Sequence, residues 1–333
     1  MFQREFRKIA NIIEKKLKEA KKVAIFYDSD ADGCCSAALL IIYLLKEFKK
    51  YPDHLVSCLH DVDEKLKGVE SDLVFILDTQ PKKEDRENFI IIDHHLIQKV
   101  PKKSIIFNPM LLDKNAYIAT SCLIYRILNK LTDLSDACWI ASIGIKADKS
   151  EKTSEDILKL TYKEYPEFKK LESKLIRLTS VSKNLLDANI VVNSLIECYN
   201  IGSPSFFGKT ESSSKLVKMS KRINLEFKLV MNSLKELLKT KKISFYGIYS
   251  DFNIQSLVAN SLFMREPKKT IIVCNLKEDL MRAEVRSMRD GDFKKFEKKL
   301  KEIIEDIGGH KRAFGFSLKR EKLDDLLKVL ANF

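Results

Sequence analysis

The chain has 333 residues, a length that suits about two domains, each able to bury a core. Charged residues make up 32% and apolar residues 45% of it, and the formal net charge is +13, a composition typical of globular proteins rather than disordered ones. No apolar run approaches the roughly 20 residues of a membrane-spanning helix, and the charged N-terminus lacks the pattern of a secretion signal, so we expect a cytoplasmic protein without membrane association.

A strand, a tight loop and a helix open the predicted fold. Residues Val23–Tyr27 are apolar and β-prone, the loop DSDADG follows, and SAALLIIYLLKEF is apolar on most sides, like a buried helix. Four further strands are predicted at His54–His60, Leu73–Leu77, Phe89–Ile92 and Ile105–Phe107, and helices at Ala119–Leu131 and Ala137–Ile145. Continuous apolar strands that alternate with helices predict a doubly wound parallel α/β sheet.

The second half of the sequence first becomes helical and then returns to α/β. The stretch from about Asp148 to Lys242 is helical and charged, with a break at Ile201–Ser214 that is a candidate linker or mobile loop. Strands are then predicted at Ile243–Tyr249, Thr270–Cys274 and Arg312–Leu318, and a helix at Phe293–Asp306. We therefore expect an N-terminal α/β domain over residues 1–185, a helical connector over 186–240 and a smaller C-terminal α/β domain over 241–333.

The basic charge favours a polyanionic partner, since neutralising phosphates releases counterions. An alternative is a surface network of ion pairs, as in lysine- and glutamate-rich proteins from heat-loving organisms, so charge alone leaves nucleic-acid binding open. The seven cysteines include no CxxC pair. They predict buried free thiols in a reducing compartment and argue against a zinc site.

Three of the predicted strands end in an acid: Asp28, Asp78 and Asp93. The carboxyl ends of parallel strands gather at one edge of a sheet, where ligands bind. Repulsion between the three carboxylates would oppose this cluster unless cations sit there.

The first of these acids opens a loop in which Asp28, Asp30 and Asp32 alternate. Their carboxylates face the same way if the loop continues the strand, and Gly33 permits a sharp turn into the next helix. A calcium loop has the same opening but needs a Glu at its twelfth position, where this chain has Leu39 inside an apolar helix, which argues against calcium.

Two histidines follow the third acid, in the run Asp93-His94-His95. Imidazole and carboxylate ligands suit manganese, and also iron, zinc or cobalt. The alternative is a pair of histidines in an exposed turn. Further along, Gly144-x-x-x-Asp148 ends a helical segment with another acid.

In their order and spacing these motifs resemble the four motifs of DHH phosphoesterases. Asn108-Pro109 resembles the Asn-Pro signature of RecJ-like members, and Asp28 resembles the RecJ-type replacement for a histidine that many relatives carry where this chain has Phe26. In the C-terminal half, residues 285–289 (VRSMR) resemble the Ser/Arg strand of the DHH-associated domain, and residues 308–317 resemble its glycine-rich signature, with Ile307 in place of a first glycine. The resemblance covers residues 23–148 and about 243–320, and compact archaeal RecJ-like nucleases are the most similar type.

This resemblance implies a hydrolase, a metal-dependent exonuclease that cleaves single-stranded DNA or RNA to nucleoside monophosphates in replication, repair or RNA processing. It implies two Mn²⁺ ions, with Mg²⁺ or Co²⁺ as alternatives. The implied metal ligands are Asp28, Asp30, Asp32, Asp78, His94 and Asp148. Asp78 would bridge the ions, and the catalytic residues would be Asp93, which orients a ligating histidine, and His95, which faces the scissile phosphate.

The resemblance also makes residues 1–185 a DHH catalytic domain and residues 241–333 a substrate-binding domain. The implied substrate contacts are Arg286, Ser287, Arg289, Gly308, Gly309, His310 and Asn108. Replication or repair proteins of the GINS or Hef type are implied partners. The alternatives are an oligoribonuclease or pAp phosphatase, a cyclic-dinucleotide phosphodiesterase, or a replisome scaffold without activity.

Overall fold

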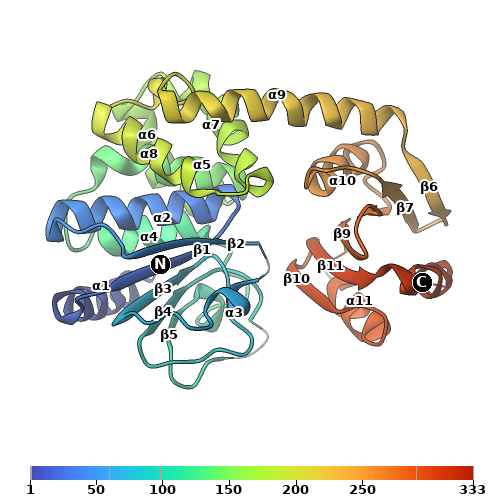
Figure 1. Cartoon of the computed structure of the whole chain (residues 1–333), viewed down its shortest axis with the longest axis horizontal. Helices are drawn as coiled ribbons and strands as arrows, with labels where there is room; N and C mark the ends of the chain where they lie inside the picture. The colour runs from blue at the N-terminus through green and yellow to red at the C-terminus, as the bar shows by residue number, and fades with distance from the viewer. Residues whose placement is uncertain (1, 60, 98–99, 290, 333) are drawn as a thin grey trace. The chain divides into compact units, whose positions relative to one another are not determined.

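The structure, a computed structural model, describes residues 2–59, 61–97, 100–289 and 291–332. It divides into two compact units, Met1–Ser220 and Lys221–Phe333 (Figure 1). The break predicted near residues 201–214 falls inside the first unit, as a short helix at Pro204–Phe206 with loops around it. The three-part division at residues 185 and 240 stays a prediction.

The first unit is built on a five-stranded parallel sheet in the order β2-β1-β3-β4-β5. Its strands are β1 (Val23–Asp28), β2 (His54–Cys58), β3 (Leu73–Leu77), β4 (Phe89–Ile92) and β5 (Ile105–Phe107). From β2 on one side of β1 the chain crosses to β3 on the other, so the direction of winding reverses between β1 and β3. Ligands of doubly wound folds bind at the carboxyl ends of the strands that flank this switch point.

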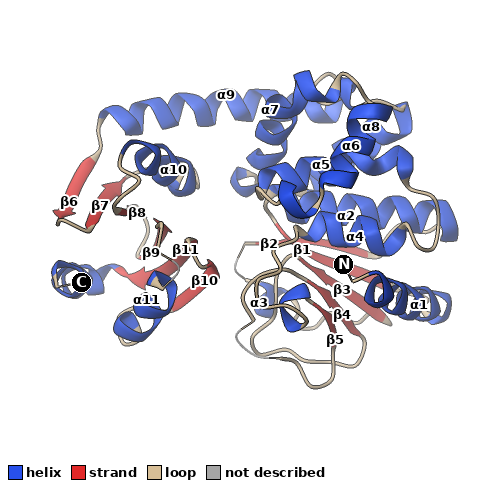
Figure 2. Ribbon diagram, turned by 180° about the vertical axis from the view of Figure 1, so that it is seen from behind, coloured by secondary structure: helices blue, strands red, loops and turns tan. Residues whose placement is uncertain are grey.

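Helices cover both faces of this sheet, as Figure 2 shows. The helices of the unit are α1 (Gln3–Glu19), α2 (Ala31–Tyr43), α3 (Val62–Lys65), α4 (Thr120–Leu128), α5 (Cys138–Ala147), α6 (Glu155–Glu164), α7 (Phe168–Thr179) and α8 (Asn189–Ile201). Every residue of α2 is buried, because α2 packs on β1 and under α4 and α5. On the other face, Val62 of α3 and the following Leu66 pack on the apolar side chains of β1, β3 and β4.

The second unit has a six-stranded mixed sheet in the order β10-β11-β9-β8-β7-β6. Its strands are β6 (Lys235–Lys239), β7 (Ile243–Ile248), β8 (Thr270–Asn275), β9 (Leu280–Arg286), β10 (Asp306–His310) and β11 (Ala313–Lys319). Its helices are α10 (Gln255–Arg265), α11 (Asp292–Leu300) and α12 (Leu323–Ala331), and α9 (Glu211–Asn232) runs across the division between the units. Phe296 of α11 lies edge-on to Phe314 of β11 and anchors the helix on the sheet.

These observations confirm the predicted fold class, a parallel α/β domain followed by a smaller α/β unit. Two local predictions were wrong. The helix predicted at Phe293–Asp306 ends at Leu300, and Asp306 begins β10, because the glycines after it pair with β11. Residues 235–239 form edge strand β6 rather than helix, since pairing with β7 outweighs their local propensity.

The remaining structural expectations concern thiols and membranes. All seven cysteines are free and buried, as predicted. Within the described ranges, the helices are too short or too polar for one to cross a bilayer. Residue 60, the last of the predicted strand His54–His60, lies outside the described residues, and β2 ends at Cys58.

Candidate metal centre

Three acids meet at the carboxyl edge of the parallel sheet. Asp28 is the last residue of β1, Asp78 follows β3, and Asp93 follows β4. Asp78 and Asp93 continue the ladder, since their backbone amides donate to Ile92 O and Phe107 O. Asp78 has a φ of 60°, in the left-handed region, which costs roughly 1–2 kcal/mol and is tolerated better by Asp than by most residues. Such local strain is typical of functional sites.

The DSDADG loop turns sharply at this edge. Asp28 Oδ1 accepts the backbone N–H of Asp30 at 2.9 Å, and Asp30 Oδ1 caps α2 by accepting the backbone N–H of Gly33 at 2.9 Å. A Cβ on Gly33 would lie 2.1 Å from the carbonyl oxygen of Asp28, so only glycine fits there. The loop therefore holds both carboxylates at the switch point.

Asp32, in the first turn of α2, is buried and reaches the start of α4. Its carboxylate accepts the backbone N–H groups of Thr120 at 2.6 Å and Ser121 at 3.0 Å. A Cβ on Gly144 of α5 would come within 2.4 Å of Asp32 Oδ1, which explains the glycine of the Gly144-x-x-x-Asp148 pattern. Asp32 thus joins three helices at the site.

His94 lies between two acids. Its Nε2 is 3.3 Å from Asp78 Oδ1 and 3.1 Å from Asp148 Oδ2, and the imidazole is buried. Tyr117 supports this arrangement, because its ring lies 5.5 Å from that of His94 and its hydroxyl donates to Asp148 O at 2.8 Å. The exposed-turn alternative for His94 is thereby excluded.

His95 points to a different acid. Its Nδ1 lies 2.7 Å from Oδ1 of the fully buried Asp93, whose Oδ2 accepts from Gln80 Nε2 at 2.8 Å. Buried Asn108 donates to His95 O at 3.0 Å and therefore supports the same histidine. Asp93 had been predicted to orient a ligating histidine, and the histidine it orients in the structure is His95, not His94.

Burial and mutual repulsion govern protonation at the site. Burial, reinforced by Asp30, raises the pKa of Asp28 to about 7, and burial with Asp148 raises the pKa of Asp32 to about 7. Burial and Asp32 hold the pKa of Asp78 well above its usual range. For Asp30, burial is outweighed by Lys183 and the Gly33 amide, so its pKa is lowered. The repulsion between these carboxylates is thus only partly offset by the cationic groups beside them, a condition that a bound cation would relieve.

The two histidines are held as cations by their acids. Burial alone would lower the pKa of His94, but Asp148 raises it to about 9. Burial likewise opposes the charge of His95, but Asp93 raises its pKa to about 9, and in return His95 lowers the pKa of Asp93. A ligating His94 must lose this proton, so a metal ion would bind in exchange for it.

The donor set fits divalent cations. Two groups, Asp32–His94–Asp148 and Asp78–Asp93–His95, each place their candidate ligand atoms within 4.8 Å of one another. Asp78 Oδ2 is buried and has no hydrogen-bond partner among the described residues. A buried carboxylate oxygen without a donor, set among other carboxylates and an imidazole, suits Mn²⁺, Mg²⁺ or a similar ion.

The structure therefore brings the six predicted ligands to one sheet edge. Asp28 and Asp30 lie outside the two compact groups but act electrostatically on them. Sequence reasoning missed three neighbours: Thr120, whose hydroxyl donates to Asp78 Oδ1 at 2.8 Å, Gln80, and Lys183, whose Nζ is 3.5 Å from Asp30 Oδ2. Gln80 follows Asp78 by two residues and could have been predicted as a site residue from the sequence. Nothing in the sequence around Lys183 indicates that it lies at the site.

The predicted substrate residues of the second unit lie on β9, β10 and the loop after β9. Arg286 is engaged within the protein: it donates to Asn260 Oδ1, Glu284 Oε2 and Ser256 Oγ. Ser287 is buried and bonded to Asp292. These contacts hold α10 and α11 to the sheet, and direct substrate contacts by Arg286, Ser287 and the buried Asn108 stay predictions.

The other predicted substrate residues of this unit lie on edge strand β10 and in the loop after β9. Gly308 of β10 is exposed, with no atom within 4 Å of a Cβ added there. Gly309 has a φ of 121°, and a Cβ on it would lie 2.8 Å from Ala313 O, so glycine is required. His310 ends the strand, and Arg289 is exposed in the loop after β9. Substrate binding by these residues also stays a prediction.

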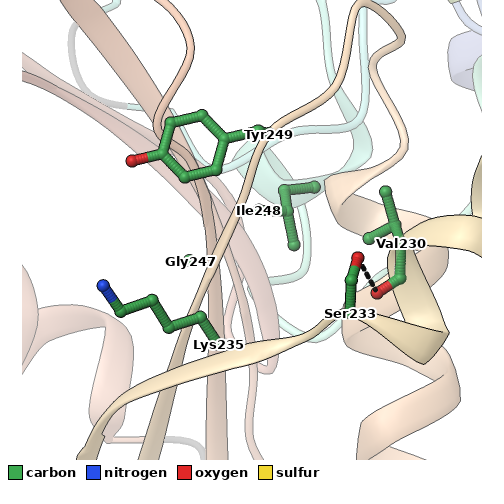
Figure 3. A pocket seen from close by; sticks show the side chains of 6 residues that line it. All are labelled: Val230, Ser233, Lys235, Gly247, Ile248 and Tyr249. Carbon is green, nitrogen blue, oxygen red and sulfur yellow. Dashed lines mark hydrogen bonds between the residues drawn. The ribbon is translucent and has the colours of Figure 1, made fainter.

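A cavity of about 190 Å³ lies elsewhere in the second unit, between the end of α9 and strands β6 and β7 (Figure 3). It is lined by Val230, Ser233, Lys235, Gly247, Ile248 and Tyr249. Ser233 Oγ donates to helix carbonyls, and the lining contains no carboxylate or imidazole.

Comparison with known proteins decides the family of this site. Residues 22–162 match the profile of the DHH family, N-terminal domain. These residues form a DHH-family domain. All four predicted motifs fall within the matched range, which confirms their resemblance to the DHH family, and the family indicates a hydrolase of the phosphoesterase class.

Relatives and solved structures extend the likeness beyond this domain. YorK of Bacillus subtilis, whose name describes an SPbeta-prophage-derived single-strand DNA-specific exonuclease, is 25% identical over 97% of this chain and 67% of its own length. RecJ of Thermus thermophilus in complex with Mn²⁺ has a TM-score of 0.75 at 15% identity, over 98% of this chain. This chain spans about half, 54%, of that RecJ. A further exonuclease RecJ, bound to manganese, has a TM-score of 0.67 at 16% identity and is matched over 93% of its chain.

Proposed function

We propose that this chain is a metal-dependent exonuclease that hydrolyses phosphodiester bonds at an end of single-stranded nucleic acid and releases nucleoside monophosphates. The observation that carries the proposal is the placement of His94 between Asp78 and Asp148, beside a buried Asp78 oxygen that lacks a donor. The names of YorK and RecJ support nucleic acid as the substrate.

The metal ligands in this proposal are the six predicted residues, Asp28, Asp30, Asp32, Asp78, His94 and Asp148. When bound, two divalent cations supply a hydroxide near neutral pH and stabilise the leaving oxygen. Thr120 and the amides at the start of α4 hold Asp78 and Asp32 in place, so the ligands are set before a cation arrives. Mn²⁺ is the proposed ion.

His95 is the proposed contact for the scissile phosphate. Its Nδ1 is committed to Asp93, so Nε2 is the nitrogen that can donate to a phosphate oxygen. The buried Asp93 keeps the ring protonated near neutral pH and fixes its orientation, and Gln80 in turn fixes Asp93. A charged donor held in this way stabilises negative charge that develops on phosphorus oxygens in the transition state.

Charge supports a polyanionic substrate. Residues 221–333 contain 25 Lys and Arg against 16 Asp and Glu, a net charge of +9, while residues 1–220 carry the remaining +4. The unit without the acidic cluster is thus the strongly basic one, and it also holds the exposed glycine backbone of β10. This distribution favours a substrate longer than a dinucleotide.

End-labelled DNA and RNA strands of 30 nucleotides, and a dinucleotide, test the proposal. We expect Mn²⁺-dependent release of mononucleotides from the long strands, abolished by EDTA and by Asp78→Asn. Asp325→Asn, an exposed acid of α12, is the matched control and should retain full activity. Activity without divalent cations, or full activity in Asp78→Asn, would contradict the proposal. Cleavage of the dinucleotide alone would favour the small-substrate phosphodiesterases of the family instead.

The intact cluster opposes the alternative of an inactive scaffold. Association with replication or repair proteins of the GINS or Hef type is a separate prediction, which a pull-down with the purified chain tests. We place the protein in nucleic-acid replication, repair or processing on the strength of the proposed substrate alone.

A further inference from the structure

Lys183 reaches the acidic cluster from a part of the chain that the family profile does not cover. It lies in a short 3-10 helix at Ser180–Asn184, after α7, and the profile ends at residue 162. Its Nζ is 3.5 Å from Asp30 Oδ2, and its side chain is 41% exposed, so the ammonium sits at the border between the cluster and solvent.

The segment that carries Lys183 is fixed against the sheet. Asn189, at the start of α8, accepts the hydroxyl of buried Tyr27 at 2.7 Å and donates to Leu55 O at 3.0 Å. Tyr27 directly precedes Asp28 at the end of β1. Asn189 therefore anchors the start of α8 on β1 and β2, and in the segment just before it Lys183 lies beside Asp30, close to the carboxyl end of β1.

The charge of the metal-loaded site allows Lys183 to take a further partner besides Asp30. Under the proposed function, five carboxylates and two divalent cations leave one negative charge, and a phosphodiester adds another. Once a cation neutralises Asp30, the attraction between Asp30 and Lys183 weakens. A partly exposed pair of this kind contributes little to stability. A partly exposed ammonium beside the cations is then suited to a phosphate oxygen.

We propose that Lys183 contacts a non-bridging phosphate oxygen of the bound single strand and is a substrate-binding residue of the site. The inference rests on the proposed function. It explains why a flexible, cationic side chain from the helical region points at an acidic cluster, and it adds to the site a contact from outside the DHH motifs.

Lys183→Gln tests this contact, with Lys183→Arg as the conservative variant. Lys159→Gln is the matched control, because Lys159 also lies in the helical region of the first unit and pairs with one acid, Glu155, at 3.4 Å. In Lys183→Gln we expect KM for a 30-nucleotide strand to rise roughly tenfold or more, the loss expected for one charged hydrogen bond. The slope of log KM against log salt should become shallower by about 0.7.

Binding gives a readout independent of turnover. A fluorescent strand with nuclease-resistant phosphorothioate linkages, titrated with Mn²⁺-loaded protein, should bind Lys183→Gln more weakly with the same loss of salt dependence. Lys183→Arg should recover most of the affinity, and Lys159→Gln should match the wild type. Melting temperatures of all variants verify folding.

Each other outcome overturns the proposal. If the wild type is active and Lys183→Gln keeps its KM, strand affinity and salt slope, Lys183 is not a substrate contact while the proposed function stands. Tighter Mn²⁺ binding in Lys183→Gln with unchanged strand affinity would make Lys183 only the counter-charge of the empty site. A wild-type protein that neither cleaves nor binds single strands would contradict both the proposed function and this inference.

Discussion

Raising the pH of the metal-free protein from 5 to 8 should destabilise the first unit. Asp28 and Asp32 each have a pKa of about 7 in the folded chain against 3.8 in the unfolded one. The folded state binds these protons more tightly. The contribution of the two carboxyl groups to the free energy of unfolding is therefore fully present below pH 3.8 and is lost as the pH rises through 7. His94 and His95, with pKa values raised from 6.5 to about 9, act in the same sense between pH 6.5 and 9.

The magnitude follows from these values. One carboxyl with a pKa of 3.8 unfolded and about 7 folded loses roughly 2–3 kcal/mol of unfolding free energy between pH 5 and 8. Since the acids interact and do not titrate independently, we take one such loss as the expected total. For a unit of 220 residues this corresponds to a fall in Tm of roughly 5–10 °C.

Calorimetry in EDTA at pH 5, 6, 7 and 8 measures this fall, and a second series with saturating Mn²⁺ should recover it, since ligand at about 100 times its Kd adds roughly 2.7 kcal/mol. Asp28→Asn keeps an oxygen that can accept the Asp30 amide but cannot ionise, so its Tm should depend less on pH. A metal-free Tm that stays flat or rises between pH 5 and 8 would refute the reasoning.

Three substitutions test the supports of the site. Gly144→Ala would place a methyl group 2.3 Å from Ser121 Oγ. Denaturant unfolding should show that the free energy of unfolding falls by about 1–3 kcal/mol, and activity should be lost. An unfolding free energy equal to that of the wild type would contradict the packing argument. Thr120→Val removes the hydroxyl that donates a hydrogen bond to Asp78, and calorimetric titration should show Mn²⁺ affinity reduced about 10- to 100-fold. An unchanged Kd for Mn²⁺ would show that Thr120 does not support the ligand. Arg286→Ala removes two side-chain hydrogen bonds that hold α10 to β9, to Asn260 and Ser256, so the second unit should melt at lower temperature. An unchanged Tm would leave Arg286 with a binding role only.

The gathering of these acids could be predicted from the sequence because each ends or directly follows a strand. Runs such as LVFIL and FIII identify buried parallel strands, and the parallel sheet then forces Asp78 and Asp93 to the same edge. The alternation of Asp28, Asp30 and Asp32 was equally readable. Chain order and strand ends therefore sufficed to predict which acids meet.

Partners within the site were not readable in the same way. Asp93 contacts His95 rather than His94. This pairing depends on side-chain rotamers at a strand end, which the spacing of residues in the sequence does not determine. Lys183 and Asn189 approach through the packing of α7 and α8, distant in sequence from the motifs. Strands β6 and β10 were missed because pairing with β7 and β11, not local propensity, makes them extended.

The proposed function requires that the carboxylates around His94 hold a pair of divalent cations. Anomalous diffraction at the manganese edge, from crystals grown with Mn²⁺, tests it most directly. We expect two peaks per chain, bounded by Asp78, His94 and Asp148 and lost in Asp78→Asn crystals. Crystals without a peak at that edge of the sheet, or with manganese bound only elsewhere, would contradict the claim.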